Sequence, residues 1–515
     1  MASRISLRVL AALGLVWLVM RFVGLQVSPP GFWMDEAWPA THSMCLAETG
    51  HDADGVRWPL YSTAGGGSQH ALTLLGFNVV WLHVFGTSRA AFRAVAGFWV
   101  IITCVALFDL SRSLMAMIPS PPQDEREAAA RRSMPWWVLL SALLSPWGFH
   151  FSRIAWDAPL AAGLLIVSLA SLARARRLGR ASIPWSVACG IFGALAMITY
   201  NPLRVTTPLV LLGATVVLGL TLPDLRARYA FLKRATLAAG CQLAVMGPTL
   251  IKLLNGEINA RINALVIFND QWVTAHRDHV PRALFILGSL LDNLALYLRP
   301  SYLLFWGDPN ARHSPHIIGQ LSPLDDLALA LVAITVIAHG YRSLRSPETP
   351  PMPHHALHAT GRWLAVIAAS AVVAGALGAL PAALTWERQP HALRSIGAWP
   401  FIALFSGAVI AGAWSLRRSL APVIATVAVA YSAWFFPSYF HAYDNADPLL
   451  FFRSAADAVE AGPAPESPRV AIEQVARSLN LPDQVLRYYL MHDGHLSCDE
   501  AVDTLRKLRR APRQR

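Results

Sequence analysis

Long apolar stretches are the feature that most constrains how this chain can fold. A helix needs about 20 mostly apolar residues to cross a bilayer, and by that measure the sequence holds roughly eleven spans. Of its 515 residues, 55% are hydrophobic and 14% are charged, whereas a soluble domain carries about 25% charged residues. This pattern predicts an all-α polytopic membrane protein and excludes a disordered chain, a disulfide-rich scaffold and a repeat solenoid. The expected spans are 7–27, 92–112, 135–150, 157–173, 183–200, 203–222, 235–254, 324–341, 362–384, 397–415 and 420–438.

Basic residues gather in alternate short loops between these spans. The clusters lie at 112–132, 174–180, 226–234, 342–345 and 417–418. By the positive-inside rule these loops face the cytoplasm, so the N-terminus lies inside and the intervening loops lie outside. We therefore expect an integral, multi-pass protein of the plasma (inner) membrane. The same loops explain the net charge of +12, and no basic stripe on a polar domain indicates a nucleic-acid partner.

Two parts of the chain are distinguished by this pattern. Residues 1–440 form the transmembrane domain, whose long outer loops 28–91 and 255–323 are expected to carry interfacial helices. Segment 71–86 is apolar but short, and we interpret it as such a helix; a true span there would invert all later loops. Residues 441–515 form a small outer tail of unknown role, in which 482–491 has a helical pattern that starts at Pro482.

Linkers and cysteines add little that is specific. Segments 118–133 and 346–360 read as cytoplasmic linkers, and a solvated loop is favoured over a metal site for the three histidines of the second linker, His354, His355 and His358. Cys45 and Cys498 both fall in outer segments, so a disulfide between them is one option that the sequence leaves open.

The first outer loop holds the most informative residues. Asp35 and Glu36 are adjacent carboxylates between Trp33 and Trp38, directly after the first span. At headgroup depth they are partly desolvated, which raises the pKa of a carboxyl group and makes its ionised form a stronger base. Acids also cap helix N-termini, so capping and catalysis are both open at this point.

A second acid lies in a very short outer loop. Arg153 and Asp157 are four residues apart and would share one helix face, where they can pair. That pair either stabilises the end of the helix as a simple ion pair or lies close to Asp35 in a functional site.

Further polar side chains lie in the other outer loops, and any one of them alone is typical of a headgroup anchor. Their concentration on one leaflet is less ordinary. A base together with guanidinium groups that bind phosphate suits sugar transfer from a lipid-linked donor. The residues are Gln69, His70, Tyr200, Arg204, Asp308, Arg312, His313, Glu387, His391 and Arg394.

At several motifs the chain resembles the C-type glycosyltransferase (GT-C) superfamily, and in particular its branch of protein O-mannosyltransferases and lipid A aminoarabinose transferases. The resemblance covers about residues 7–452. The motifs are Asp35-Glu36 after the first span, Pro59-Leu60-Tyr61 ahead of the interfacial helix, Gly86-Thr87-Ser88 with Arg93, Ser152-Arg153 with Asp157, Tyr200 with Arg204, and Leu303 to His313 running on to Gly319. Segment 65–70 departs from the charged motif of aminoarabinose transferases, which argues against that donor.

The resemblance implies a role for each motif residue. Asp35 is the expected base of an inverting transfer, and Glu36 belongs to the same catalytic group. Asp157 matches a second family acid, which orients the acceptor or, in some members, a divalent ion. No cofactor is certain, although Asp35, Glu36 and Asp157 could hold a divalent cation if they converge. The expected donor-phosphate ligands are Arg204, Arg312, His313, Tyr200 and, more weakly, Arg153. The expected substrate-binding residues are Gln69, His70, Asp308 and Arg394.

The predicted function is therefore a hexosyl- or pentosyltransferase at the outer membrane face. It takes a sugar from a polyprenyl-monophosphate donor and passes it to a hydroxyl of a protein, a lipid or a glycan. The sequence leaves the sugar, the acceptor and the oligomeric state open. The alternative is a transporter or flippase of a lipid-linked or anionic substrate, against which the scarcity of acids inside the spans argues, Asp109 being the main exception. An inactive relative that serves as a scaffold is the third possibility.

Overall fold

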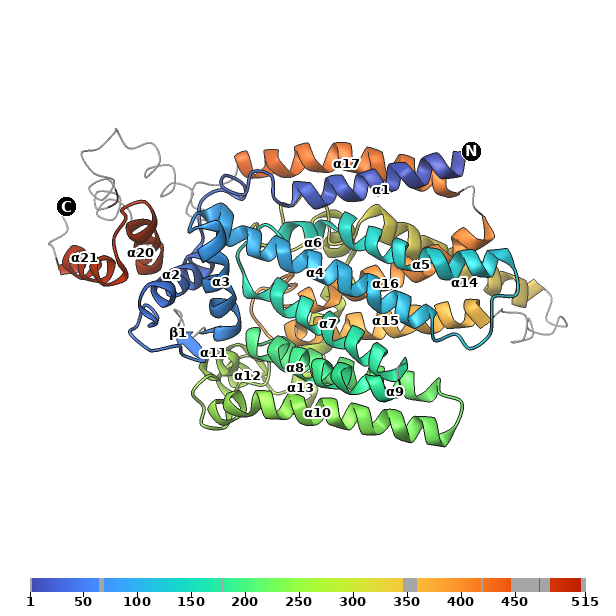
Figure 1. Cartoon of the computed structure of the whole chain (residues 1–515), viewed down its shortest axis with the longest axis horizontal. Helices are drawn as coiled ribbons and strands as arrows, with labels where there is room; N and C mark the ends of the chain where they lie inside the picture. The colour runs from blue at the N-terminus through green and yellow to red at the C-terminus, as the bar shows by residue number, and fades with distance from the viewer. Residues whose placement is uncertain are drawn as a thin grey trace.

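The computed structural model is an elongated helical bundle (Figure 1). It describes residues 2–63, 69–177, 179–345, 359–417, 420–445, 472 and 482–510. Eleven long helices occupy the segments predicted to span the membrane: α1 (Ala2–Met20), α4 (Arg89–Met115), α5 (Glu125–Leu144), α7 (Asp157–Arg177), α8 (Ile183–Thr199), α9 (Leu203–Leu220), α10 (Leu225–Leu254), α14 (Pro323–Arg345), α15 (Ala359–Ala383), α16 (Trp399–Leu416) and α17 (Leu420–Asp444). The all-α polytopic fold predicted from the sequence is thereby confirmed.

Shorter elements connect the long helices. They are α2 (Met34–Thr49), β1 (Tyr61–Thr63), β2 (Gln69–Ala71), α3 (Leu72–Phe85), α6 (Pro146–Phe151), η2 (Gly179–Ser182), α11 (Ala260–Leu265), α12 (Asp270–His276), α13 (Arg282–Tyr297), η3 (Ser301–Phe305), η5 (Ile396–Ala398), α20 (Asp483–His492) and α21 (Cys498–Arg510). The antiparallel strands β1 and β2 pair Ser62 with His70. The helices predicted at 71–86 and 482–491 are confirmed as α3 and α20.

The core of the bundle consists of packed aromatic side chains and of small residues at close helix contacts. Trp17 of α1 lies 4.8 Å from Phe435 of α17 and 5.4 Å from Phe149 of α6, measured between ring centroids. Helices approach closely where glycine is present: a side chain at Gly407 of α16 would meet the backbone of Val138 on α5. Small residues allow such close helix contacts inside a membrane, where packing replaces the hydrophobic driving force.

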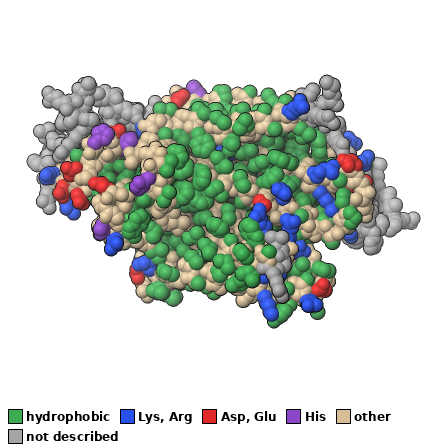
Figure 2. Space-filling view, in the orientation of Figure 1, with side chains coloured by type: hydrophobic (Ala, Val, Ile, Leu, Met, Phe, Trp, Pro, Cys, Tyr) green, Lys and Arg blue, Asp and Glu red, His purple; other side chains and the backbone are tan. Residues whose placement is uncertain are grey.

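Charged side chains separate toward the two ends of the bundle. Figure 2 shows hydrophobic side chains across the middle, acidic and histidine side chains mostly toward the end that carries α2 and α20, and Lys and Arg mostly toward the other. We call the first the site end and the second the opposite end. Among the described helices, eight are long and apolar enough to cross a membrane, and seven of them coincide with predicted spans.

The eighth such segment, Arg282–Phe305, lies in the predicted outer loop 255–323. Both ends of its helix α13 contact the loop after α15: Trp272 packs against Phe285 and stacks on Trp386, and the Tyr297 hydroxyl donates to Gln389 Oε1 at 2.5 Å. By length and composition the segment is apolar enough to cross a membrane, so its interfacial position stays a prediction.

Three predicted boundaries are wrong. The supposed linker 118–133 is helical from Glu125, where the Asp124 side chain caps α5 by accepting from Glu127 N–H at 2.7 Å. The predicted span 135–150 breaks after Leu144, because Ser145 caps the separate helix α6. The predicted span 7–27 is helical only to Met20, since the Arg21 guanidinium turns inward to the carbonyls of Leu143 and Gly148. The second linker, with His354, His355 and His358, lies mostly outside the described residues.

The tail is fastened to the site end. Cys45 of α2 and Cys498 of α21 form a disulfide, with 5.3 Å between their Cα atoms. Tyr488 of α20 packs against Phe32 with ring centroids 4.5 Å apart, and its hydroxyl donates to Thr87 O at 3.1 Å. The disulfide that the sequence left open is therefore present, and it holds α20 and α21 against α2, whose first turn contains Asp35.

Candidate active site

Asp35 lies in the first turn of α2, behind the N-cap residue Trp33. Its Oδ2 accepts a hydrogen bond from Trp33 Nε1 at 3.2 Å. Burial raises the pKa of Asp35, and the positive charges of Arg261 and Arg312 partly oppose that rise. The helix N-terminus also favours an anion here. Asp35 is thus a partly desolvated carboxylate with cations nearby, a combination typical of functional sites.

Glu36, the next residue, has hydrogen-bond donors at both of its carboxylate oxygens. Arg93 of α4 donates to both of its oxygens, at 2.8 and 2.9 Å, and both side chains are completely buried. Glu36 also accepts from Ala155 N–H at 3.0 Å and from Trp33 N–H at 3.3 Å. From the sequence, Glu36 is expected in the catalytic group and among possible metal ligands. The structure gives it a different place, as the buried anchor that ties α2 to α4 and to the loop before α7.

The loop after η3 brings a cation over Trp33. The Asp308 side chain accepts from Asn310 N–H at 2.7 Å, and the Asn310 side chain accepts from Arg312 N–H at 3.1 Å. These two successive turns are the structural reason for the Asp-Pro-Asn-Ala-Arg sequence. They place the Arg312 guanidinium 3.8 Å from the centre of the Trp33 ring. Burial lowers the pKa of Arg312, while the Asp35 carboxylate raises it. Arg312 and Asp35 therefore face one another across Trp33.

Gly307 makes this loop possible. Its φ of +76° lies in the left-handed region, and a Cβ there would stand 2.5 Å from Ser314 Oγ. The sequence Trp306-Gly307-Asp308 requires glycine at its centre for both reasons.

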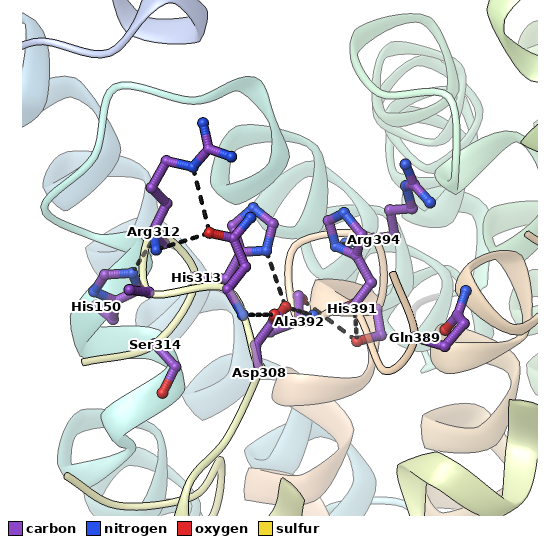
Figure 3. A network of polar contacts seen from close by, with 12 residues as sticks. His150, Asp308, Arg312, His313, Ser314, Gln389, His391, Ala392 and Arg394 are labelled. Carbon is purple, nitrogen blue, oxygen red and sulfur yellow. Dashed lines mark hydrogen bonds and ion pairs between the residues drawn. The ribbon is translucent and has the colours of Figure 1, made fainter. Parts of the chain in front are cut away.

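A second loop, 384–395, meets the first at Asp308. Asp308 Oδ2 accepts from His313 Nδ1 at 2.9 Å and from Ala392 N–H at 2.6 Å. The rings of His313 and His391 lie 4.5 Å apart between centroids. Figure 3 shows these two histidines side by side above Asp308, with the guanidinium groups of Arg312 and Arg394 on either side of them. The pKa of His391 lies well below its usual value because the ring is buried and faces His313 and Arg394.

Asp157 and Tyr200 complete the cluster from the bundle side. Asp157 begins α7, and its carboxylate repels that of Asp35. Tyr200 ends α8, and its pKa is raised by burial and by Asp157, while Arg394 and Arg261 lower it. The Tyr200 phenol therefore interacts electrostatically with the carboxylates of Asp157 and Asp35 and with the guanidinium groups of Arg394 and Arg261. Asp35, Asp157, Tyr200, Arg312, His313 and Arg394, all predicted as site residues, are brought together.

Arg261 of α11 belongs to this cluster, although sequence reasoning missed it. Its side chain is exposed, and within the part of the chain that the structure describes it makes no hydrogen bond or ion pair. It is nevertheless the strongest cationic influence on Asp35 and also acts on Tyr200 and His391. Outer loop 255–323 holds four further arginines, Arg277, Arg282, Arg299 and Arg312, and no motif distinguishes Arg261 from them in the sequence.

Four other predicted site residues are elsewhere. Arg153 is buried and donates to Met20 O at 2.7 Å and Ser28 O at 2.8 Å, so the predicted pair with Asp157 is wrong; the chain between them is not helical. Arg204 donates to Met197 O and lies over the ring of Tyr61.

Gln69 and His70 belong to β2. The Gln69 amide donates to Glu257 O at 3.3 Å. Both ring nitrogens of His70 are buried without a hydrogen-bond partner among the described residues, and burial lowers the pKa of His70 to about 3. No described contact links either residue to Asp35.

Comparisons with known proteins were made at the level of sequence and of fold. No family model matches the sequence, and no curated protein sequence does. Among solved structures, the chain is similar to ArnT from Cupriavidus metallidurans bound to undecaprenyl phosphate, with 16% identity over 97% of this chain and 88% of that chain and a TM-score of 0.40. It is also similar to the archaeal oligosaccharyltransferase AglB from Archaeoglobus fulgidus in complex with an inhibitory peptide and a dolichol-phosphate, with 12% identity over 89% of this chain and 58% of that chain and a TM-score of 0.41. Both are glycosyltransferases of the GT-C fold, the superfamily that the sequence motifs resemble. At this degree of similarity the matches assign no residue and no substrate to the chain.

Proposed function

We propose that the chain is a membrane glycosyltransferase that moves a sugar from a polyprenyl-monophosphate donor to a hydroxyl acceptor at the site end. In this proposal residues 1–440 are the catalytic domain and the site end faces away from the cytoplasm. The observation that carries it is the position of Asp35: a half-buried carboxylate with one described hydrogen bond, facing Arg312 and Arg261.

Asp35 is the proposed base. It takes the proton of the acceptor hydroxyl as that oxygen attacks the anomeric carbon of the sugar. The bond between that carbon and the phosphate oxygen breaks, its electron pair leaves with the polyprenyl phosphate, and the anomeric carbon is inverted. Because burial raises the pKa of Asp35, its ionised form is a stronger base than an exposed aspartate. Asp157, at the start of α7, is placed to orient the acceptor.

The departing phosphate needs cations, and the cluster supplies them. Arg312 is held over Trp33, and the positive charge of the exposed Arg261 acts on Asp35. A guanidinium offers two parallel N–H donors to a phosphate and stays charged at any physiological pH. Tyr200 and His313 line the same cluster, and so does Arg394, whose guanidinium is paired with Glu387 at 2.9 Å. Arg153 and Arg204 are engaged by protein backbone, so we do not include them among the phosphate ligands.

The experiment that tests this function separates transfer from transport. The purified chain is placed in vesicles with a polyprenyl-monophosphate sugar labelled in the sugar, and with peptide, lipid and glycan hydroxyl acceptors. We expect label on one acceptor class together with free polyprenyl phosphate, and none of either with Asp35→Asn. Glu125→Gln, at an exposed position of the opposite end, is the matched control and keeps full transfer. Movement of the intact labelled lipid across the bilayer without transfer would instead establish a flippase.

A further inference from the structure

Asp308, His313 and His391 form a buried group to which the proposed transfer assigns no chemical step. Each offers one potential metal-ligating atom, and the three atoms lie within 4.8 Å of one another. The residues come from two loops more than seventy positions apart, yet Asp308 Oδ2 and His313 Nδ1 are only 2.9 Å apart. We propose that these three side chains bind one divalent transition-metal ion of the zinc type.

The ligand set fits such an ion. Two imidazoles and one carboxylate are a common set for zinc, with bonds of about 2.0–2.2 Å and a fourth position left open. Two ligand atoms on one tetrahedral zinc then stand about 3.3 Å apart. The distance of 2.9 Å between Asp308 Oδ2 and His313 Nδ1 is close to that value, so the ion would take the place of the proton that now joins them. The His391 ring lies beside the His313 ring. Its ring nitrogen would have to move closer to the other two ligand atoms, all three of which lie within 4.8 Å of one another.

The surroundings hold the ligands in position, as outer-shell contacts do at metal sites. The second oxygen of Asp308 accepts from Asn310 N–H, and its backbone carbonyl lies 2.8 Å from His316 Nε2. The backbone N–H of His391 donates to the Tyr297 hydroxyl at 3.0 Å. Only the three side chains themselves need to move for an ion to bind.

An entry path leads to the group. A cavity of about 510 Å³ opens beside η3 and is lined by Asp308, Pro309, His316, Gln389 and Pro390, among others. Of the three proposed ligands, Asp308 borders this cavity, so an ion that enters it meets that residue first. The site lies next to Arg312, where the proposed function places the donor phosphate; that neighbourhood rests on the proposed function, whereas metal binding itself does not.

A second His/Asp group at the site end is a weaker candidate. His42, Asp52 and Asp54 also lie within ligand distance of one another. However, His42 Nδ1 accepts from Ala53 N–H, and the carboxylate of Asp52 accepts from Asp54 N–H, Val56 N–H and the Ser62 hydroxyl. These bonds shape the loop before β1, and Asp54 is exposed, whereas all three residues of the first group are buried.

The test uses the full chain in detergent, stripped with a chelator and titrated with Co²⁺ and then Zn²⁺. We expect one ion per chain, with the visible absorption bands of Co²⁺ bound to nitrogen and oxygen ligands, and displacement by Zn²⁺. His313→Gln and His391→Gln are each expected to weaken binding at least about 100-fold, since even outer-shell changes weaken metal binding 10- to 100-fold. His279→Gln, at an exposed position of the same outer loop, is the control and binds as wild type.

Folding is followed in the same samples. Zn²⁺ is expected to raise the unfolding temperature of the wild type and of His279→Gln but not of His391→Gln, which keeps the Asp308–His313 bond and unfolds like the wild type in chelator. The inference is overturned if the wild type binds no ion, if binding survives in both His313→Gln and His391→Gln, or if only His42→Gln abolishes it. None of these readouts uses sugar transfer, so they leave the proposed function untouched.

Discussion

Both ends of the bundle hold ion pairs, and those at the site end include Arg93–Glu36 and Arg394–Glu387. The site end differs because it also holds charged groups with few partners. At the opposite end, acids are paired with arginines: Arg174 lies 2.5 Å from Asp109, Arg131 lies 3.1 Å from Glu127 and Arg132 lies 2.7 Å from Glu125. At the site end, Asp35 has one described hydrogen bond, from Trp33, and the exposed Arg261 has none within the described chain. Ion pairs of the first kind stabilise a fold, whereas incompletely paired charged groups that lie close together are typical of a site that binds a charged ligand.

The same contrast exists between two adjacent residues. Asp35 and Glu36 both lie in the first turn of α2, but Glu36 is neutralised by Arg93 while Asp35 is desolvated and faces cations across Trp33. The Glu36 carboxylate anchors α2, whereas α2 positions the Asp35 carboxylate. The predictions below test this division of roles.

The largest expected effect is on stability, from Glu36→Gln. This change leaves the completely buried Arg93 without its counter-ion, and breaking a buried pair costs about 3–5 kcal/mol. Glu125→Gln, which breaks the exposed pair with Arg132, is expected to cost less than about 1 kcal/mol. Chemical unfolding of both variants in detergent measures the difference. Equal losses would mean that Glu36 is not a structural anchor.

The next effect is on transfer, from Arg312→Ala. If Arg312 binds the donor phosphate, kcat/KM is expected to fall about 100-fold, since removing one preorganised donor from a developing charge costs about 2.7 kcal/mol or more. Arg312→Lys is expected to recover part of the rate, because the ammonium keeps the charge without the forked geometry. Arg174→Ala, at the opposite end, is the control and leaves kcat/KM within about twofold; an equal loss there would argue against a local role for Arg312.

A smaller effect concerns pH and His70. The pKa of His70 falls to about 3 in the folded chain through burial, whereas an unfolded histidine has a pKa of about 6.5. The folded state is therefore favoured fully above pH 6.5 and loses about 1.4 kcal/mol for each pH unit below it until the folded pKa is reached. His70→Gln should flatten the dependence of the unfolding temperature on pH between 6.5 and about 5. An unchanged slope would show that another group titrates there.

Much of the fold is visible in the sequence, because about 20 apolar residues in a row have few alternatives to a spanning helix. The misplaced boundaries occur where distant partners decide the outcome. Arg21 ends α1 by turning to carbonyls more than one hundred positions away, and no local pattern in 7–27 reveals them. Glu125 extends α5 through a cap at Asp124, which the Pro-rich linker composition concealed.

Part of the candidate site was also predictable from the sequence. Asp35, Arg312 and His313 stand in short motifs with an evident chemical purpose, and the structure brings them together. Glu36 and Arg153 have equally suggestive positions, but their partners, Arg93 and the carbonyls of Met20 and Ser28, are set by tertiary packing. Arg261 carries no motif at all, and only the folding of α11 against the cluster reveals it.

The most direct test of the central claim is a single-turnover measurement with Asp35→Asn, made beside a measurement of donor binding. The amide keeps the size of the side chain but cannot accept a proton as a base. If Asp35 is that base, a labelled polyprenyl-monophosphate sugar should bind within about threefold of the wild-type affinity, while the transfer rate falls at least about 100-fold. A transfer rate close to that of the wild type in the same samples would contradict the account.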